Sequence, residues 1–198
     1  MYPDTRLIDA LSAGSSSTRL QAALAVGTHP DPALVDVLVA RSAVEPDFFV
    51  RDMLTWALTR LPPEITLPGL RAELRSGRAQ ARSQALHTLS KIGDSSVWPA
   101  ITRSLLRDAD DEVARTAWRT AVLLVPDGEQ GGLAVELATQ LGRGDRSVRR
   151  SLSRALVALG DVVVAALQPG LASADPSVRA HARATEALLR DPAGATGC

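Results

Sequence analysis

The chain has 198 residues with 22 basic and 22 acidic side chains, and this balance argues against a dedicated non-specific nucleic-acid binder, because such domains usually carry net positive charge. Its one cysteine is Cys198, which excludes an intrachain disulfide and a cysteine-based metal site. No basic segment followed by an apolar run opens the sequence, and charged residues interrupt every span long enough to cross a bilayer, so we expect a soluble cytoplasmic protein.

Apolar residues recur with helical spacing along almost the whole chain, and aromatic residues make up only 3% of it. We predict helices that pair into antiparallel hairpins over residues 4–13 and 16–26, 32–42 and 47–61, 65–75 and 78–92, 95–107 and 110–125, 130–141 and 145–159, and 161–172 and 176–190. The corresponding repeats cover about 1–28, 29–62, 63–93, 94–126, 127–160 and 161–190 of a single array at 1–190, followed by a flexible tail at 191–198. One hairpin cannot bury its apolar face alone, so neighbouring hairpins must stack.

A short motif marks these repeats about every 30 to 35 residues. Each first helix carries two apolar residues four positions apart, and each second helix begins near an anchor position. The anchors are Thr18, Val50, Ala81, Val113, Val148 and Val178. Arginine follows most anchors directly, at Arg19, Arg51, Arg82, Arg149 and Arg179. We expect these arginines to cover apolar surface with their stems while each guanidinium binds an acidic or carbonyl partner in the next unit.

Helix boundaries are predicted from capping residues. The residue three positions before the anchor is acidic in four repeats, and we expect these residues to be N-caps: Asp47, Asp110, Asp145 and Asp175. Gly27, Gly93 and Gly160 are predicted to close second helices in the left-handed conformation. Repeat two departs from the pattern, since it inserts about five residues, Ala43 to Asp47, between its helices.

The best-formed repeats resemble a known family. Asp145 to Arg149 spell D-x-x-V-R, 158–161 continue as A-L-G-D, and Pro68 and Pro99 fall inside predicted first helices. This pattern is similar to HEAT repeats, specifically the phycobilisome-lyase HEAT-like repeats of bacteria. The resemblance implies an all-α fold, a right-handed α-solenoid of about six helical hairpins. It says little about activity, because such repeats serve many functions.

In HEAT-like arrays the second helices line the concave side, so we predict the binding surface from the positions opposite their buried stripe. These are offsets +2, +5, +6 and +9 from each anchor on a helical wheel. The predicted concave strip consists of Asp52, Trp56, His87, Arg115, Trp118, Arg119, Arg150, Arg154 and Arg183. Tryptophan and arginine often dominate interface energetics, and arginine forks around carboxylate or phosphate. The alternative is that Trp56 and Trp118 pack between helices and the arginines form a solvated face.

Phe48 and Phe49 stand beside the insertion and form a second candidate contact. If they are exposed, they indicate a partner or self-association site, whereas packing beneath the inserted loop is the alternative. The histidines at positions 29, 87 and 181 are far apart and lack carboxylates at ligand spacing, so we expect no metal site and no cofactor.

These observations favour a non-enzymatic scaffold or adaptor that binds a protein partner in its concave groove. One alternative is a nucleic-acid binder similar to the HEAT-like alkylpurine DNA glycosylases, in which Asp52, Trp56, Trp118 and Arg119 would line a cleft. Another is the bilin lyase or chaperone-like role implied by the name of the repeat. No nucleophile elbow, phosphate loop or dinucleotide fingerprint occurs in the sequence.

Overall fold

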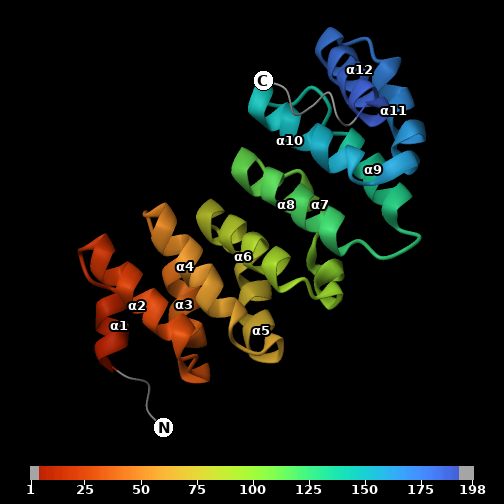
Figure 1. The fold of residues 1–198 in the computed structure, drawn as a ribbon. Helices are drawn as coiled ribbons and strands as arrows, with labels where there is room; N and C mark the ends of the chain where they lie inside the picture. Colours follow the sequence, from red (N-terminus) through yellow and green to blue (C-terminus); the bar gives the residue numbers. More distant parts are fainter. Residues whose placement is uncertain (1–4, 192–198) are drawn as a thin grey trace. The chain divides into compact units, whose positions relative to one another are not determined.

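The computed structural model describes residues 5–191, and the chain divides into two compact units, one ending at Ala100 and the other beginning at Ile101. Each unit is built from antiparallel helical hairpins, and residues 5–191 contain no β-strand (Figure 1). The predicted all-α solenoid architecture is therefore confirmed for each unit. The predicted tail lies outside the described residues apart from Asp191.

Unit 1 holds three hairpins and the beginning of a fourth. Its first helices are α1 (Thr5–Leu11), α3 (Val35–Ser42, after a 3₁₀ turn at Pro32–Leu34) and α5 (Pro63–Glu73). Its second helices are α2 (Ser16–Thr28), α4 (Phe48–Thr59) and α6 (Ala79–Ile92), and a 3₁₀ segment follows at Ser95–Ala100. Helix α4 packs between α2 and α6, while α3 packs against α5, so first and second helices form two layers.

Unit 2 repeats this layering. Its first helices are α7 (Arg103–Leu106), α9 (Gln130–Ala138) and α11 (Val163–Leu171, after a 3₁₀ turn at Gly160–Val162). Its second helices are α8 (Asp111–Leu124), α10 (Arg146–Val157) and α12 (Pro176–Arg190). Helix α10 packs between α8 and α12, and α9 packs between α7 and α11.

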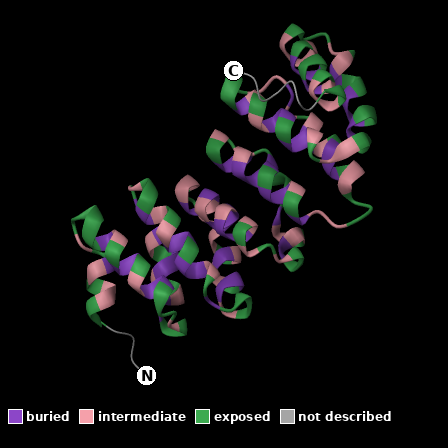
Figure 2. Ribbon diagram, viewed as in Figure 1, coloured by how far each residue is buried: buried purple, intermediate pink, exposed green. Residues whose placement is uncertain are grey.

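The core lies between the two layers of each unit (Figure 2). The apolar pairs of the first helices supply one side, as at Leu34 and Leu38, and anchors such as Val50 and Val113 supply the other. The expected helix at 95–107 is wrong as one element, because it is divided at Ile101–Thr102 into a 3₁₀ segment and the short α7. Pro99 lies in this 3₁₀ segment and cannot donate the backbone hydrogen bond of a continuous helix.

The capping residues act largely as predicted. All four aspartates are N-caps whose carboxylates accept backbone N–H groups of the following turn. Gly93 closes α6 with a left-handed φ of 73°. The prediction for Gly27 is wrong, because α2 continues through Thr28. A Cβ at Gly27 would come within 2.2 Å of the Trp56 ring, so this glycine makes room for an aromatic side chain rather than ending a helix.

Three of the arginines that follow the anchors bind within their own hairpin, whereas we predicted a partner in the next repeat. Arg51 donates to the carbonyls of Glu45 and Pro46, and Arg179 donates to those of Ser173 and Ala174, so each binds the turn of its own hairpin. Arg82 bonds to the carbonyl of Ser76 in the same way. The second helix therefore supplies a cation that binds backbone carbonyls of the turn after its own first helix.

Arg19 combines both arrangements. It donates to the carbonyls of Ala13 and Gly14 within its own hairpin, and to the carboxylate of Glu45 in the next one. Arg149 differs from the others, since its Nε is buried without a hydrogen-bond partner among residues 5–191.

Candidate partner-binding surfaces on the second helices

The offset +5 row of the second helices is buried wherever a further second helix of the same unit packs beside it. Thr55 of α4 lies 3.4 Å from Thr88 of α6 between their hydroxyl oxygens, and Ser153 of α10 lies 2.8 Å from Thr185 of α12. A wheel drawn for one helix places this row outward, but lateral packing of consecutive second helices covers it. The residues at offsets +2 and +6 are exposed or half-buried except Ser83 of α6, and we call these positions the outward rows.

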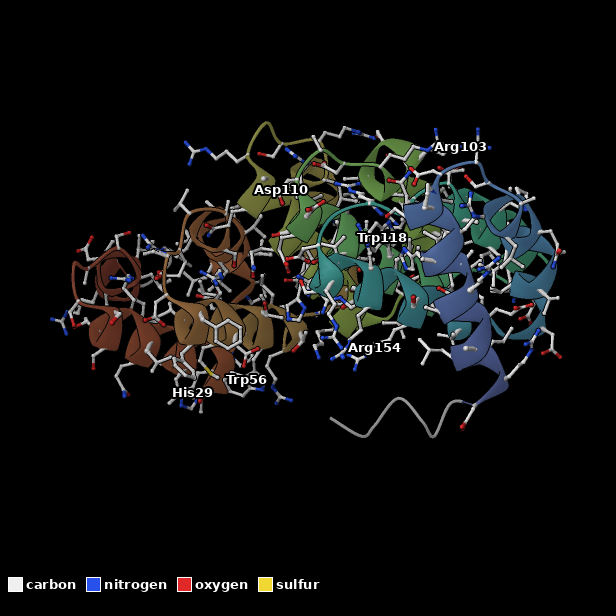
Figure 3. All side chains as sticks on the ribbon, turned by 90° about the horizontal axis from the view of Figure 1, so that it is seen from above. His29, Trp56, Arg103, Asp110, Trp118 and Arg154 are labelled. Atoms are coloured by element: carbon white, nitrogen blue, oxygen red, sulfur yellow. The ribbon has the colours of Figure 1, made fainter. Side chains whose placement is uncertain are left out.

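Trp118 is therefore wrongly predicted as a surface residue. Its side chain has no exposed area, and its indole Nε1 donates to the carbonyl of Leu106 at 2.8 Å. The guanidinium of Arg143 lies 5.9 Å from the ring centroid and also bonds to Asp111. Trp118 thus joins α8 to α7 and to the turn before α10, and it cannot contact a partner. Figure 3 shows it in the interior of unit 2.

In unit 1 the outward rows carry a small apolar surface. Trp56 of α4 is 36% exposed and Leu24 of α2 is 42% exposed, and Figure 3 shows the Trp56 ring near the outer side of unit 1, with His29 close by in this view. The six-membered ring of the indole lies against α2 at Gly27, where a Cβ would collide with it. The ring is thus held in one position while part of it faces solvent. Asp52 is exposed on the same helix, and His87 of α6 is half-buried.

In unit 2 the outward rows carry arginine. Arg115 and Arg119 of α8 lie 3.6 and 3.7 Å from the carboxylate of Glu112. Arg150 and Arg154 of α10 are exposed and have no ion pair or hydrogen bond from their side chains within residues 5–191. Figure 3 shows Arg154 on the side of unit 2 away from Arg103, which belongs to the first-helix layer.

Arg183 of α12 is exposed although it occupies offset +5. No second helix follows α12 within the described residues, so nothing covers this row there. Sequence analysis also missed Arg146, which lies two positions before its anchor and is exposed at the start of α10. Its spacing of four residues from Arg150 was the available signal.

Phe48 and Phe49 are 65% and 70% exposed at the start of α4. Their rings meet edge to face at 5.6 Å, and the guanidinium of Arg51 lies 5.9 Å from the Phe48 centroid. The alternative in which they pack beneath the inserted loop is therefore wrong. They remain a second candidate contact.

The inserted loop contains a buried acid that sequence analysis did not identify. The Glu45 side chain has no exposed area and receives Arg19 Nε at 2.7 Å, Arg41 Nε at 2.8 Å and the backbone N–H of Asp47 at 2.9 Å. Burial raises the pKa of Glu45, but hydrogen bonds from Arg19, Asp47 and Arg41 outweigh it and lower the pKa to about 2. The Glu45 carbonyl accepts from Gln80 of the third hairpin, so this residue connects three hairpins.

His181 of α12 is also buried, which sequence analysis did not predict. Its Nδ1 accepts the backbone N–H of Gly142 at 3.0 Å, so its Nε2 carries the proton and donates to the carbonyl of Arg149 at 3.0 Å. Burial lowers the pKa of His181, and the Arg149 guanidinium lowers it further, against the opposing effect of the hydrogen bond to the Arg149 carbonyl. The neutral ring joins α12 to α10 and to the turn that precedes α10.

Among residues 5–191, no group of three His, Cys, Asp or Glu side chains is placed to hold a metal ion. No single helix there is both long and apolar enough to cross a membrane, and only the segments Arg146–Val157 and Gly160–Leu171 taken together, across a bend of 116°, reach that threshold.

Comparison with protein-family models finds no match to this chain, and comparison with curated protein sequences finds no relative. Several solved structures have a fold similar to that of this chain. An engineered protein matches with a TM-score of 0.52 at 18% identity, over 98% of this chain and 100% of the other. The complex of CpcE and CpcF of phycocyanin lyase from Nostoc sp. PCC7120 matches with a TM-score of 0.52 at 20% identity, over 92% and 75% of the two chains.

Cex1p matches with a TM-score of 0.53 at 18% identity, over 98% of this chain and 44% of Cex1p. Identities this low establish likeness of fold and carry no activity from one protein to another. By its fold, the chain is a helical-repeat protein.

Proposed function

We propose that the chain is a non-enzymatic scaffold or adaptor that binds a partner protein through the outward rows of its second helices. Repeat architectures support this function, because they present side chains at regular intervals on an open surface. Most residues at offsets +2 and +6 are at least partly exposed on this scaffold, although Ser83 is buried and the Trp56 ring packs on α2 at Gly27.

Trp56 is the observation that carries the proposal. A partly exposed indole seated on a glycine is a rigid apolar anchor, and tryptophan is the residue type most enriched among those that dominate binding energy. Leu24 is exposed on the adjoining α2, so an incoming apolar side chain can contact both residues. The packing of the ring on Gly27 limits the conformational entropy lost on binding.

The nucleic-acid alternative is weakened by the position of Trp118. The proposed glycosylase-like cleft needed this ring to face a nucleotide, and the ring is enclosed in unit 2. The bilin-lyase alternative is supported only by the likeness of fold to CpcE and CpcF. It predicts an absorbance change when the protein is mixed with a bilin and an acceptor protein.

The scaffold proposal is tested by affinity capture from native cells with quantitative mass spectrometry. We expect Trp56→Ala combined with Leu24→Ala to remove the specific partner, while helical circular dichroism and the melting temperature stay close to wild type. The matched control is Leu123→Ala with Val135→Ala, which removes side chains that are 66% and 61% exposed in unit 2. Partner capture that survives the first double variant would reject the proposed surface.

A further inference from the structure

The exposed side of α10 carries three arginines in one line. Arg146, Arg150 and Arg154 are four residues apart in sequence and all exposed, so successive side chains begin about 6 Å apart along the helix axis. Helix α10 contains no acidic residue. None of the three side chains has an ion pair or hydrogen bond within residues 5–191. Like charges at this spacing destabilise a helix, so the row has a cost that the fold does not offset.

The surroundings of this row leave its charge available. The neighbouring α12 presents Ala180 and Ala184 at offsets +2 and +6, which are exposed and too small to cover the arginines. Arg183 adds a further exposed guanidinium on α12. The arginines of α10 therefore lie beside a flat apolar surface formed by the alanines of α12, on which the main chain of an extended partner segment can lie.

The positive charge of this arginine row arises from where the charged residues of unit 2 lie and not from an excess of basic residues. Residues 101–198 contain twelve arginines and twelve acidic residues, and several of these acids bind groups away from the arginines of α10. Three of them, Asp110, Asp145 and Asp175, cap second helices. Glu136 of α9 binds Arg103 and Arg107 in the first-helix layer. Glu112 contacts Arg115 and Arg119 of α8, and Asp145 also lies close enough to Arg115 for an electrostatic interaction.

The features of unit 2 favour carboxylates of a protein over nucleic acid. Trp118 is its one aromatic residue within the described chain, and it is buried, so no ring is available to stack on bases. Alternate residues of an extended peptide lie about 6.6 Å apart, which is close to the spacing of the arginine row. Arginine binds a carboxylate through two parallel hydrogen bonds.

We propose that unit 2 binds an acidic segment of a partner protein, in extended conformation with carboxylates at alternate positions, along Arg146, Arg150 and Arg154 and beside Arg183. This inference rests on the proposed scaffold function and names the chemistry of the partner.

The test uses fluorescence anisotropy with the full chain and a labelled twelve-residue peptide of alternating Glu and Gly. We expect saturable binding at low salt that weakens as salt is raised. The triple variant R146Q/R150Q/R154Q should weaken binding at least tenfold. The control variant R60Q/R75Q/R78Q removes the same charge from exposed positions of unit 1 and should change binding less than twofold.

Two further probes separate the alternatives. A peptide with Gln in place of Glu should not bind, and a single-stranded oligonucleotide of equal charge should bind more weakly than the Glu peptide. Equal loss in both triple variants, unchanged binding in R146Q/R150Q/R154Q, or tighter binding of the oligonucleotide would each overturn the inference. These outcomes leave the partner-capture result at Trp56 standing, so failure here is distinct from failure of the scaffold proposal.

Discussion

Replacing Glu45 by glutamine should destabilise unit 1 by about 3 kcal/mol at neutral pH. The side chain is fully buried and its pKa is lowered from 4.5 to about 2, and each pKa unit corresponds to about 1.4 kcal/mol of differential interaction. Removing one partner of a buried ion pair typically costs about 3 to 5 kcal/mol of stability, which is consistent with the expected destabilisation. Glutamine keeps the shape of the side chain but removes the negative charge that Arg19 and Arg41 share.

The assay is hydrogen exchange of backbone amides in α2 and α4, supported by guanidinium denaturation followed by circular dichroism. Local exchange is the better measure, because opening of one part of a repeat array need not unfold the rest. We expect amides of α2 and α4 in Glu45→Gln to exchange about a hundredfold faster than in wild type at pH 7, which corresponds to about 3 kcal/mol.

The pH dependence follows from the direction of the shift. Because the pKa of Glu45 is lower in the folded chain, its contribution is complete above the ordinary value of 4.5 and is lost as pH falls toward 2. The difference between wild type and Glu45→Gln should therefore shrink over that range. Glu64→Gln, at an exposed position of α5, is the control and should cost less than about 1 kcal/mol. A difference below about 0.5 kcal/mol at pH 7, or one that stays constant down to pH 3, would refute the reasoning.

Three other predictions concern the second helices. Arg150→Glu should stabilise unit 2 by up to about 1 kcal/mol, because it places a carboxylate four residues from two arginines, and it should abolish binding of the acidic peptide. Thermal melting measures the change in stability, and anisotropy measures the loss of binding. A loss of stability would contradict the inference that the arginines of α10 repel one another. Gly27→Ala should destabilise unit 1 by about 1 to 3 kcal/mol through overpacking against Trp56. In a Trp56→Ala background the same change should stabilise unit 1, because only the higher helix propensity of alanine remains. Chemical denaturation of the wild type, the two single variants and the double variant shows whether the effect of Gly27→Ala on stability changes sign. Unit 2 should lose stability as pH falls below about 6.5, the ordinary pKa of histidine, because burial lowers the pKa of His181 and a proton on Nδ1 removes its bond to Gly142. Amide exchange in α12 should therefore become faster between pH 7 and 5 in the wild type but not in His181→Gln.

The sequence was sufficient to predict the hairpins and most helix boundaries to within a few residues, but not the division of the segment 95–107. Spacing of apolar residues, aspartate caps and Gly93 are local signals, because each depends on contacts within a few residues of the same helix. Pro68 lies inside α5 as the repeat pattern predicts. Gly27 shows the limit of such signals, because the sequence alone does not distinguish a glycine that makes room for an aromatic ring from a glycine that ends a helix.

The binding surface required the tertiary structure. Exposure at offset +5 cannot be predicted from one helix alone. Trp118 is enclosed by contacts with α7 and with the turn before α10, while Arg183 at the same offset of α12 is exposed. The partners of Glu45 likewise come from separate helices, and nothing in its own segment marks it as buried. Local pattern thus determined which residues form most of the helices and where most of these helices begin and end. Lateral packing of one hairpin on the next decided which side chains remain available for a partner, because that packing depends on residues about 30 or more positions apart.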